Sequence, residues 1–507
     1  MDLLLAIDLG STSIKAVIYD LNGTIISSAA SPTIRVNPST EHPEWAIWDP
    51  AQVWDGVCQA IREAGSRVRD LSGLKGIAVT GMGMDGLPVD RDGTPLYPFI
   101  SWHDPRTMPQ AEAWKKRLGE LETFSITGFP SWHMMAAMRM LWLAEHHPEI
   151  MDKTCKWLFI EDYVNFKLCG TMATDYSMAS CSLLFDQRKQ AWSDELIRAA
   201  GIDRRILPDC LPSGTPLGAV TPAAAAATGL PPRIPVFLGG HDHICCTLPL
   251  GGFKDESVVD IIGTWESVLI STPAPVLSPK VLAAQICVQS HVIPNRYVAW
   301  GGAVSGESIE WIRNIFRDEK TQKSFEWESV EKALEGAGAK PSGVFYLPHI
   351  AGGGCPVGDK LSKGAFVGLT NTTAKANLFR AVFEGLNYQF LDILKAFETS
   401  LQVTPKHITV TGGGTRNRFW LQNKADVSGI PISASNLAET TSLGAAILAG
   451  IGAGLYRDAE DACNRLDNKT VEAYEPTPAL AAYYAEQYGI YKELYPALKA
   501  IHHRIGQ

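Results

Sequence analysis

The sequence predicts an α/β protein with more than one domain, and three observations support this. The chain has 507 residues, more than a single hydrophobic core usually holds. Apolar runs of strand length alternate with longer segments of helical periodicity. A strand, a polar glycine turn and a second strand occur at 6–20 (AIDLGSTSIKAVIYD) and again at 259–271 (VDIIGTWESVLIS). Two such halves would place two polar turns across one cleft, although two unrelated hairpins would give the same short pattern.

Composition excludes several classes of function. Apolar residues make up 46% of the chain and charged residues 20%, the balance of an ordinary globular protein. The net charge of −9 argues against binding to nucleic acid or to an acidic membrane. The N-terminal apolar run is short, lacks a basic leader and is interrupted by Asp8, so it predicts a β-strand rather than a signal peptide. The ten cysteines contain no C-x-x-C pair, which is typical of reduced thiols in a cytoplasmic protein.

The first part of the chain is predicted to open with antiparallel strands and to continue mainly as helix. Asn22-Gly23 and Asp92-Gly93 are dipeptides typical of hairpin turns. The expected elements are strands at 3–7, 15–20 and 76–81, a helix at about 50–68, and mainly helical structure over 105–230.

The second part alternates buried strands with long helices. The first strand, 234–238, is a continuous apolar run that ends in Gly239-Gly240-His241-Asp242. The other expected elements are strands at 257–262, 267–270 and 407–411, and helices at 305–316, 374–400, 417–428 and 442–454. This alternation is typical of α/β domains.

The first polar turn could hold a phosphate. Glycine lets backbone N–H groups approach an anion, hydroxyl groups add donors, and a lysine adds positive charge. The candidate phosphate-binding residues are Gly10, Ser11, Thr12, Ser13 and Lys15. Asp8 could reach a phosphate only through Mg²⁺ or water, because direct contact would be repulsive. An ordinary polar hairpin turn would have the same sequence pattern. The spacing of the glycines is not that of a Walker A loop.

Two further glycine turns could extend a nucleotide site. Gly263 and Thr264 lie between two strands and could add a phosphate contact. Gly413 and Gly414 lie in a strand-to-helix junction that also contains Asn417, where a helix N-terminus favours an anion or a polar ring edge. Neither turn matches the Rossmann fingerprint, and both could also be ordinary tight turns.

Asp242 is the candidate catalytic base. It follows a buried strand and two glycines, so its carboxylate would point into the cleft that the strand faces. A carboxylate within hydrogen-bond reach of an alcohol is what phosphorylation of that alcohol requires. His241 and His243 flank it and could compete for the role, and an aspartate at this place could instead cap a helix.

The motifs together resemble the FGGY carbohydrate kinase family, whose members include glycerol kinase, xylulokinase, L-fuculokinase and ribulokinase. The most specific match is GAFVGL at 364–369 followed by NLFRAVFEG at 377–385, which agrees with the family's C-terminal fingerprint. The resemblance runs from about residue 7 to 454. It implies two actin-like (ribonuclease H-like) α/β domains, at 1–246 and 247–507, with mixed sheets flanked by helices and a ligand cleft between them.

Roles follow from the resemblance position by position. Asp242 matches the aspartate that activates the sugar hydroxyl, and Asp8 matches the carboxylate near Mg²⁺. The first turn and Gly263-Thr264 match positions that face phosphate, and the third turn matches the nucleotide region. The implied sugar-binding residues are Met84, Asp85, Trp102, Asp104, Asp242 and His243.

Three departures from the family pattern bear on the substrate. Arg139 replaces a lysine, and Gly353-Gly354-Cys355-Pro356 replaces Glu-Arg-Ser/Thr-Pro; both changes are expected to touch only peripheral packing. The pocket motif GMDG at 83–86, with LYPFISWHDPRT at 96–107, is similar to L-fuculokinases, whereas Asp104 before Arg106 is closer to glycerol kinases and xylulokinases.

The expected activity is therefore ATP- and Mg²⁺-dependent phosphorylation of a terminal hydroxyl of a small ketose or polyol. An L-fuculose-like ketose is the first candidate, and D-xylulose or another pentulose or tetritol is the alternative. A sugar or nucleotide sensor on the same fold is a rival from another class, but it would be expected to lose the catalytic aspartate. The resemblance further implies a cytoplasmic homodimer or homotetramer with no nucleic-acid or membrane partner.

Overall fold

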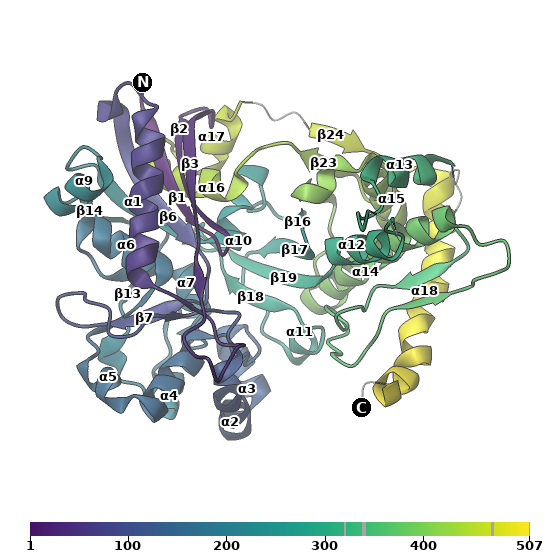
Figure 1. The fold of residues 1–507 in the computed structure, drawn as a ribbon, viewed down its shortest axis with the longest axis horizontal. Helices are drawn as coiled ribbons and strands as arrows, with labels where there is room; N and C mark the ends of the chain where they lie inside the picture. Colours follow the sequence, from purple (N-terminus) through teal and green to yellow (C-terminus); the bar gives the residue numbers. More distant parts are fainter. Residues whose placement is uncertain (319–320, 337–340, 468–470, 506–507) are drawn as a thin grey trace.

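The computed structural model describes residues 1–318, 321–336, 341–467 and 471–505. Two mixed β-sheets, each flanked by helices, lie side by side (Figure 1). The first has six strands in the order β14-β15-β6-β1-β2-β3, and the second has seven in the order β18-β19-β17-β16-β22-β23-β24. The predicted arrangement of two actin-like domains is confirmed. Every helix in the described ranges is too short or too polar to span a membrane.

The first sheet is built on the predicted N-terminal hairpin. Strands β1 (Leu3–Leu9) and β2 (Ser13–Asp20) are antiparallel, whereas β6 (Leu74–Gly81) runs parallel to β1. Alternate residues of β1 belong to two separate cores: Leu5 and Ile7 pack with helix α1, and Leu4 and Ala6 pack with helix α16. Because both faces are covered, the strand reads as a continuous apolar run. The remaining strands are β3 (Ile25–Pro32), β14 (Pro216–Ala219) and β15 (Pro235–His241).

The second sheet repeats this plan. Strands β16 (Ser257–Ile262) and β17 (Trp265–Thr272) form an antiparallel hairpin, and β22 (His407–Thr411) runs parallel to β16. The repeated strand–turn–strand pattern in the sequence therefore marks equivalent places in the two sheets. The remaining strands are β18 (Cys287–Ser290), β19 (Tyr297–Val304), β23 (Ile432–Ser435) and β24 (Val471–Tyr474).

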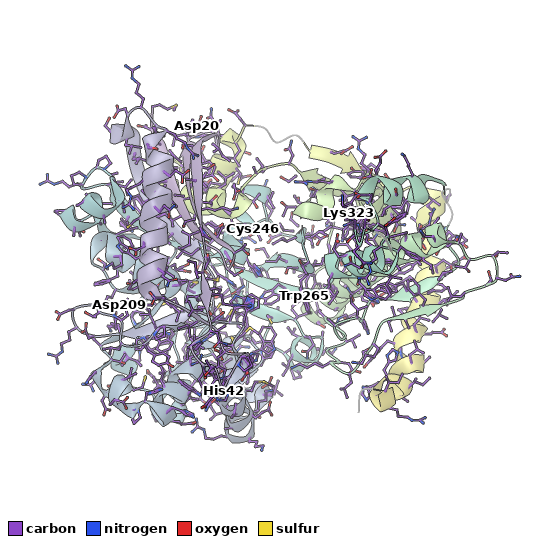
Figure 2. The ribbon with its side chains drawn as sticks, viewed as in Figure 1. Asp20, His42, Asp209, Cys246, Trp265 and Lys323 are labelled. Atoms are coloured by element: carbon purple, nitrogen blue, oxygen red, sulfur yellow. The ribbon has the colours of Figure 1, made fainter. Side chains whose placement is uncertain are left out.

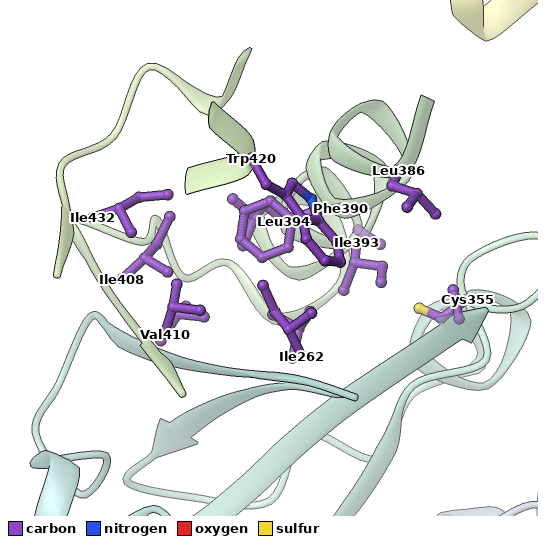
Figure 3. Close-up of a cluster of buried hydrophobic side chains, with 14 of the residues drawn as sticks. Ile262, Cys355, Leu386, Phe390, Ile393, Leu394, Ile408, Val410, Trp420 and Ile432 are labelled. Atoms are coloured by element: carbon purple, nitrogen blue, oxygen red, sulfur yellow. The ribbon is translucent and has the colours of Figure 1, made fainter. Parts of the chain in front are cut away.

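Helix α14 (Lys375–Leu401) forms the centre of the second core. It is 27 residues long, and most of it is buried. Phe390 and Leu394 meet Ile408 of β22 and Trp420 of helix α15 (Arg418–Ser428) (Figure 3). Each such side chain, when fully buried, stabilises the fold by about 1.5–3 kcal/mol. The family fingerprint at 377–385 lies in this helix, so its apolar positions are explained by packing.

Helix α16 (Thr440–Gly452) follows a strand of the second sheet but packs on the first. It contacts β1, β6 and β15. The helix approaches closely through Gly444, where a Cβ would lie 1.9 Å from the carbonyl oxygen of Cys245. The two sheets thus divide on either side of Cys246, which lies between them (Figure 2), but residues from the predicted second domain complete the core of the first.

Residues 105–230 are less helical than their periodicity predicts. They hold eight helices but also six short strands, which have two to four residues and therefore show no clear alternation. The helices are α2 (Met108–Leu118), α3 (Glu120–Thr127), α4 (Ala136–His146), α5 (Pro148–Lys153), α6 (Ile160–Cys169), α7 (Tyr176–Ser180), α8 (Asp194–Ala200) and α9 (Pro222–Thr228). Besides β14, the strands are β9 (Lys156–Phe159), β10 (Ala173–Asp175), β11 (Phe185–Asp186), β12 (Ala191–Trp192) and β13 (Asp209–Leu211).

The other elements flank the sheets. In the first domain these are α1 (Pro50–Ser66), β4 (Arg35–Val36), β5 (Ile47–Trp48), β7 (Gly86–Val89), β8 (Phe99–Ile100) and the short α10 (Asp242–Cys245). In the second they are α11 (Pro279–Ala283), α12 (Gly306–Ile315), α13 (Trp327–Gly336), β20 (Phe345–Leu347), β21 (Ala365–Val367), α17 (Ala459–Arg465) and α18 (Pro478–Ile505). The predicted helices at 305–316, 374–400, 417–428 and 442–454 are all confirmed to within two residues at each end.

Candidate active site

A cavity of about 290 Å³ joins the first polar turn to the end of β15. It brings together residues that are more than 200 positions apart in the chain. Its lining contains Asp8, Gly10, Ser11, Thr12, Ser13, Lys15, Asp242, His243, Cys246, Ile261 and Thr441. Because β1 and β15 are both parallel to β6, their carboxyl ends meet at one edge of the sheet, which is where α/β sheets usually bind ligands.

The carboxylate of Asp8 lies in the cavity with little compensation for its charge. Its pKa is raised to about 7, chiefly by burial and also by the negative charge of Asp242, with Lys15 opposing both effects. Within the described residues, no hydrogen bond to this carboxylate is formed. A carboxylate next to the hydroxyls of the first turn offers the hard oxygen ligands that Mg²⁺ prefers. The chemistry of these residues therefore fits a magnesium ion, which Asp8 could hold.

Lys15 faces a partner that the sequence did not reveal. Its Nζ lies 2.7 Å and 3.0 Å from the two carboxylate oxygens of Glu439, just before helix α16. Glu439 has a φ of 54°, in the left-handed region that non-glycine residues rarely adopt. The loop before α16 thus places a carboxylate beside the lysine that would face a phosphate.

The second turn is held in place by the start of helix α12. Gly306 donates its N–H to the carbonyl of Gly263 at 3.0 Å, and Ser305 donates to the carbonyl of Thr264 at 3.2 Å. Below the turn, the fully buried Lys424 of α15 pairs with Asp260 at 2.7 Å and with Glu266. This buried triad joins the two strands of the turn to the helix that follows the third turn.

The third turn packs on the strand that leads into the second. Gly412 has a φ of 95°, and a Cβ there would lie 2.5 Å from the carbonyl oxygen of Ile262, so glycine is required. The Asn417 side chain accepts a hydrogen bond from Trp420 N at 2.9 Å, which caps helix α15. Its buried side-chain nitrogen has no partner in the described structure. Gly413 faces open space.

The predicted sugar-binding carboxylates are buried in ion pairs. Asp85 pairs with Arg139 at 3.1 Å and accepts a hydrogen bond from Trp48 Nε1 at 2.6 Å. Burial raises the pKa of Asp85 to about 6, and Arg139 partly offsets this. Asp104 pairs with Arg106 at 2.6 Å and accepts from the Ala46 N–H at 2.7 Å.

Asp85 and Asp104 do not line the 290 Å³ cavity. The other predicted site residues outside its lining are Met84, Trp102, Gly263, Thr264, Gly413, Gly414 and Asn417. Trp102 is half-buried and stacks on His103 with ring centroids 3.6 Å apart. The structure thus joins the first turn to Asp242 and His243 in one cavity, and places the other predicted site residues outside it.

Arg139 does not lie at the periphery. The resemblance to the family had led us to expect that this residue would touch only peripheral packing. Its side chain is buried, and besides pairing with Asp85 it donates hydrogen bonds to the carbonyls of Met84 and Met134. The guanidinium therefore binds two residues of the GMDG segment and ties them to Met134. The expectation was wrong because the partner carboxylate lies 54 residues earlier in the chain.

Arg139→Lys, which introduces the residue typical of the family, is expected to destabilise this chain by about 1–2 kcal/mol, because an ammonium cannot reproduce the planar fork of donors. Urea unfolding followed by circular dichroism measures the change. Arg205→Lys is the matched control, because the side chain of Arg205 is 90% exposed. Equal stability of the two variants would show that the Arg139 contacts contribute little.

Asp242 is placed at the point where β15 passes into α10. It is the first residue of that short helix, and its Oδ1 accepts the His243 N–H at 2.6 Å. Asp242 thus accepts one backbone N–H at the start of this helix, which is part of the alternative helix-capping role. The side chain is nevertheless 24% exposed and lines the cavity opposite the first turn, so its position also suits a base.

Comparison with known proteins identifies the family. Residues 3–248 match the N-terminal domain, and residues 258–453 the C-terminal domain, of the FGGY family of carbohydrate kinases. The chain belongs to the FGGY family. It is therefore a carbohydrate kinase, and kinases of this family use ATP.

Its FGGY relatives differ in the sugar named for them. The chain is 30% identical to a xylulose kinase of Staphylococcus epidermidis over 507 residues, covering 99% of this chain and 98% of the relative. It is 29% identical to an L-fuculokinase of Escherichia coli over 465 residues, covering 91% and 94%. A solved xylulose kinase from Lactobacillus acidophilus has the same fold, with a TM-score of 0.90 at 22% identity over the full length of both chains.

Sequence reasoning missed four residues of this FGGY site. Each of them makes a contact that is distant in the chain: Arg139 with Asp85, Gln289 with His241, Lys424 with Asp260 and Glu439 with Lys15. The replacement of the family's lysine by Arg139 was a visible signal. No comparable signal pointed to the other three.

Proposed function

We propose that this chain transfers the γ-phosphoryl group of ATP to a terminal hydroxyl of a small ketose or polyol, with Asp242 as the general base. The observation that carries the proposal is the shared cavity, in which the turn from Asp8 to Lys15 faces Asp242. A phosphate cradle and a carboxylate that face one another are the two parts that phosphorylation of an alcohol needs.

In this mechanism Asp242 accepts the proton of the sugar hydroxyl as the oxygen attacks the γ-phosphorus. The new O–P bond forms as the bond to the β,γ-bridging oxygen breaks, and ADP leaves with that electron pair. Lys15 and the N–H and hydroxyl groups of the first turn stabilise the charge on the transferring group. Asp8 would hold Mg²⁺, which neutralises phosphate charge when bound. Holding the reactants in line contributes most of the acceleration in reactions of this type.

The nucleotide is proposed to extend from this cavity along the second sheet. The Gly263-Thr264 turn would contact its phosphates. The adenosine end would lie against the third turn at Gly413, which faces open space, and at Gly414, and near the unpartnered side-chain nitrogen of Asn417. This path follows the contact between β16 and the third turn.

The sugar is proposed to be an L-fuculose-like ketose, with D-xylulose or another pentulose or tetritol as the alternative. The GMDG segment, with Met84 and Asp85, together with Trp102, Asp104 and His243, would line the sugar site. Since Asp85 and Asp104 are engaged by Arg139 and Arg106, we expect them to shape this pocket through those ion pairs. The rival sensor function is disfavoured because Asp8 and Asp242 are both present and share the cavity.

A coupled ATP-consumption assay over a panel of sugars tests the proposal. The panel contains L-fuculose, D-xylulose, L- and D-ribulose, erythritol, erythrulose, glycerol and gluconate. We expect one ketose to be turned over far better than the rest. Phosphorylation of gluconate alone would contradict the proposed substrate class, and phosphorylation of glycerol alone would contradict the ketose candidates. ATP binding without turnover of any sugar would favour the sensor.

A further inference from the structure

The catalytic strand ends in a buried histidine that the mechanism has not used. His241 is 4% exposed and lies between Asp242 and the second sheet. Its Nε2 lies 3.3 Å from Asp242 Oδ1, and its Nδ1 lies 3.3 Å from Oε1 of Gln289 in strand β18. The Sγ of Cys181 is 3.8 Å from the same Nδ1. Each ring nitrogen therefore has its own polar neighbour.

His241 carries one ring proton at neutral pH. Burial lowers its pKa to about 4, and Asp242 only partly opposes this. A neutral imidazole donates from one nitrogen and accepts at the other. If Nδ1 held the proton, the Nε2 lone pair would face a carboxylate oxygen, and the buried NH₂ of Gln289, which has no partner among the described residues, would stay unpaired.

The other tautomer gives both ring nitrogens a suitable neighbour. A half-turn of the Gln289 amide brings its NH₂ to Nδ1 in place of Oε1, and Nε2 then carries the proton on the side of Asp242. Buried donors in native proteins are almost always paired, so this arrangement is favoured.

We propose that His241 is a positioning residue for Asp242, held in the Nε2–H tautomer by a hydrogen bond from Gln289. This inference rests on the proposed function, in which Asp242 is the base. It extends that function to the second sheet, because Gln289, which fixes the tautomer, lies in strand β18 of that sheet.

The arrangement divides the two oxygens of the base. Oδ1 accepts the His243 N–H at 2.6 Å and lies 3.3 Å from His241 Nε2. Oδ2 receives no hydrogen bond from the described residues and is left to face the sugar hydroxyl. A proton on Nε2 would attract Oδ1, so the two neighbouring residues together limit rotation of the carboxylate.

The other titratable groups around Asp242 are present in every His241 variant. They are Asp8, Asp85, Glu161, Cys181, His243, Cys245 and Cys246. A difference between two His241 variants therefore reports on the ring nitrogens and not on this background. The ligand-type atoms of His241, Asp242 and His243 also lie within 4.8 Å of one another, so a bound transition metal is an outcome that the test must detect.

Two substitutions test the roles of the two ring nitrogens of His241 separately. The amide of His241→Asn occupies the place of Nδ1, so it keeps the contact with Gln289 and loses the donor to Asp242. The longer side chain of His241→Gln can place an NH₂ where Nε2 was. We expect His241→Asn to lower kcat about tenfold or more with little change in the KM for ATP, and His241→Gln to recover part of the loss.

Nitrogen-15 NMR of histidine-labelled protein tests the tautomer without any activity. The signal that disappears in His241→Asn should have the pattern of an Nε2–H ring, and Gln289→Leu should shift it toward a tautomer mixture. An Nδ1–H ring, unchanged kinetics in His241→Asn or stoichiometric metal in the purified protein would each overturn the proposal. If His241→Asn does not fold, Gln289→Leu provides the same comparison. If the wild-type protein phosphorylates no sugar, the proposed function is refuted, while the NMR result still decides the tautomer.

Discussion

Asp242→Asn is expected to lower kcat about a thousandfold, within the range that positioned general bases contribute. An amide has the shape of the carboxylate but cannot accept the sugar proton. Its Oδ1 can still accept the His243 N–H, so the local backbone should stay as it is. The first turn, which does not change, should bind ATP as in wild type. Steady-state kinetics on the sugar found in the panel, with ATP affinity from calorimetry, measures both effects.

The matched control is Asp92→Asn in an exposed hairpin turn. It makes the same chemical change far from the cavity, and its kcat should equal that of wild type. Wild-type turnover by Asp242→Asn would remove Asp242 from the mechanism, whereas loss of ATP binding in that variant would show a wider role for the carboxylate.

Lys424→Met is expected to destabilise the protein by about 3–5 kcal/mol, because it leaves buried carboxylates without their cation. Lys424, Asp260 and Glu266 are all buried, and the ammonium also lies 3.7 Å from the centre of the Phe390 ring. Methionine keeps the apolar stem, so the loss should come from charge and not from a cavity. The pKa of Asp260 is already raised by burial and by Glu266, so protonation should relieve part of the penalty at low pH. Urea unfolding at pH 7 and at pH 5 measures the change.

An exposed pair provides the comparison for this substitution. Lys332 pairs with Glu328 at 2.8 Å on the surface of helix α13, and Lys332→Met should cost less than about 1 kcal/mol. Adding Glu266→Gln to Lys424→Met should restore stability, since it removes one of the stranded charges. If Lys424→Met were as stable as Lys332→Met, the buried triad would not be a source of stability.

Local chemistry in the sequence was enough to predict most of the fold. The turns at Gly10–Ser13 and Gly263–Thr264 lie between long apolar strands, and both hairpins formed where the pattern placed them. Strands of two to four residues, such as β11 and β12, were missed because so few residues show no period. The packing of α16 on the first sheet was also not predictable, because a helix that is apolar on all sides does not indicate which sheet will bury it.

The site was predictable only where motif and position agree. Asp8 and Lys15 lie in the two strands of the N-terminal hairpin and Asp242 follows β15, and the structure brings all three to one cavity. Arg139 reaches Asp85 across 54 positions of the chain, and Glu439 reaches Lys15 across 424. Nothing local in a single sequence records such distant contacts, so the ion pairs that hold Asp85 and Lys15 became visible only in three dimensions.

The return of α16 to the first sheet also bears on how the protein is made. The last strand of that sheet ends at His241, and the helix that covers its second face begins at Thr440. About 200 residues must therefore be synthesised in between, which takes roughly 10–40 s at a ribosomal rate of about 5–20 residues per second. During that interval the face formed by Leu4, Ala6 and Phe237 lacks its partner helix. The nascent chain thus carries an apolar sheet face that chaperones could bind until helix α16 covers it.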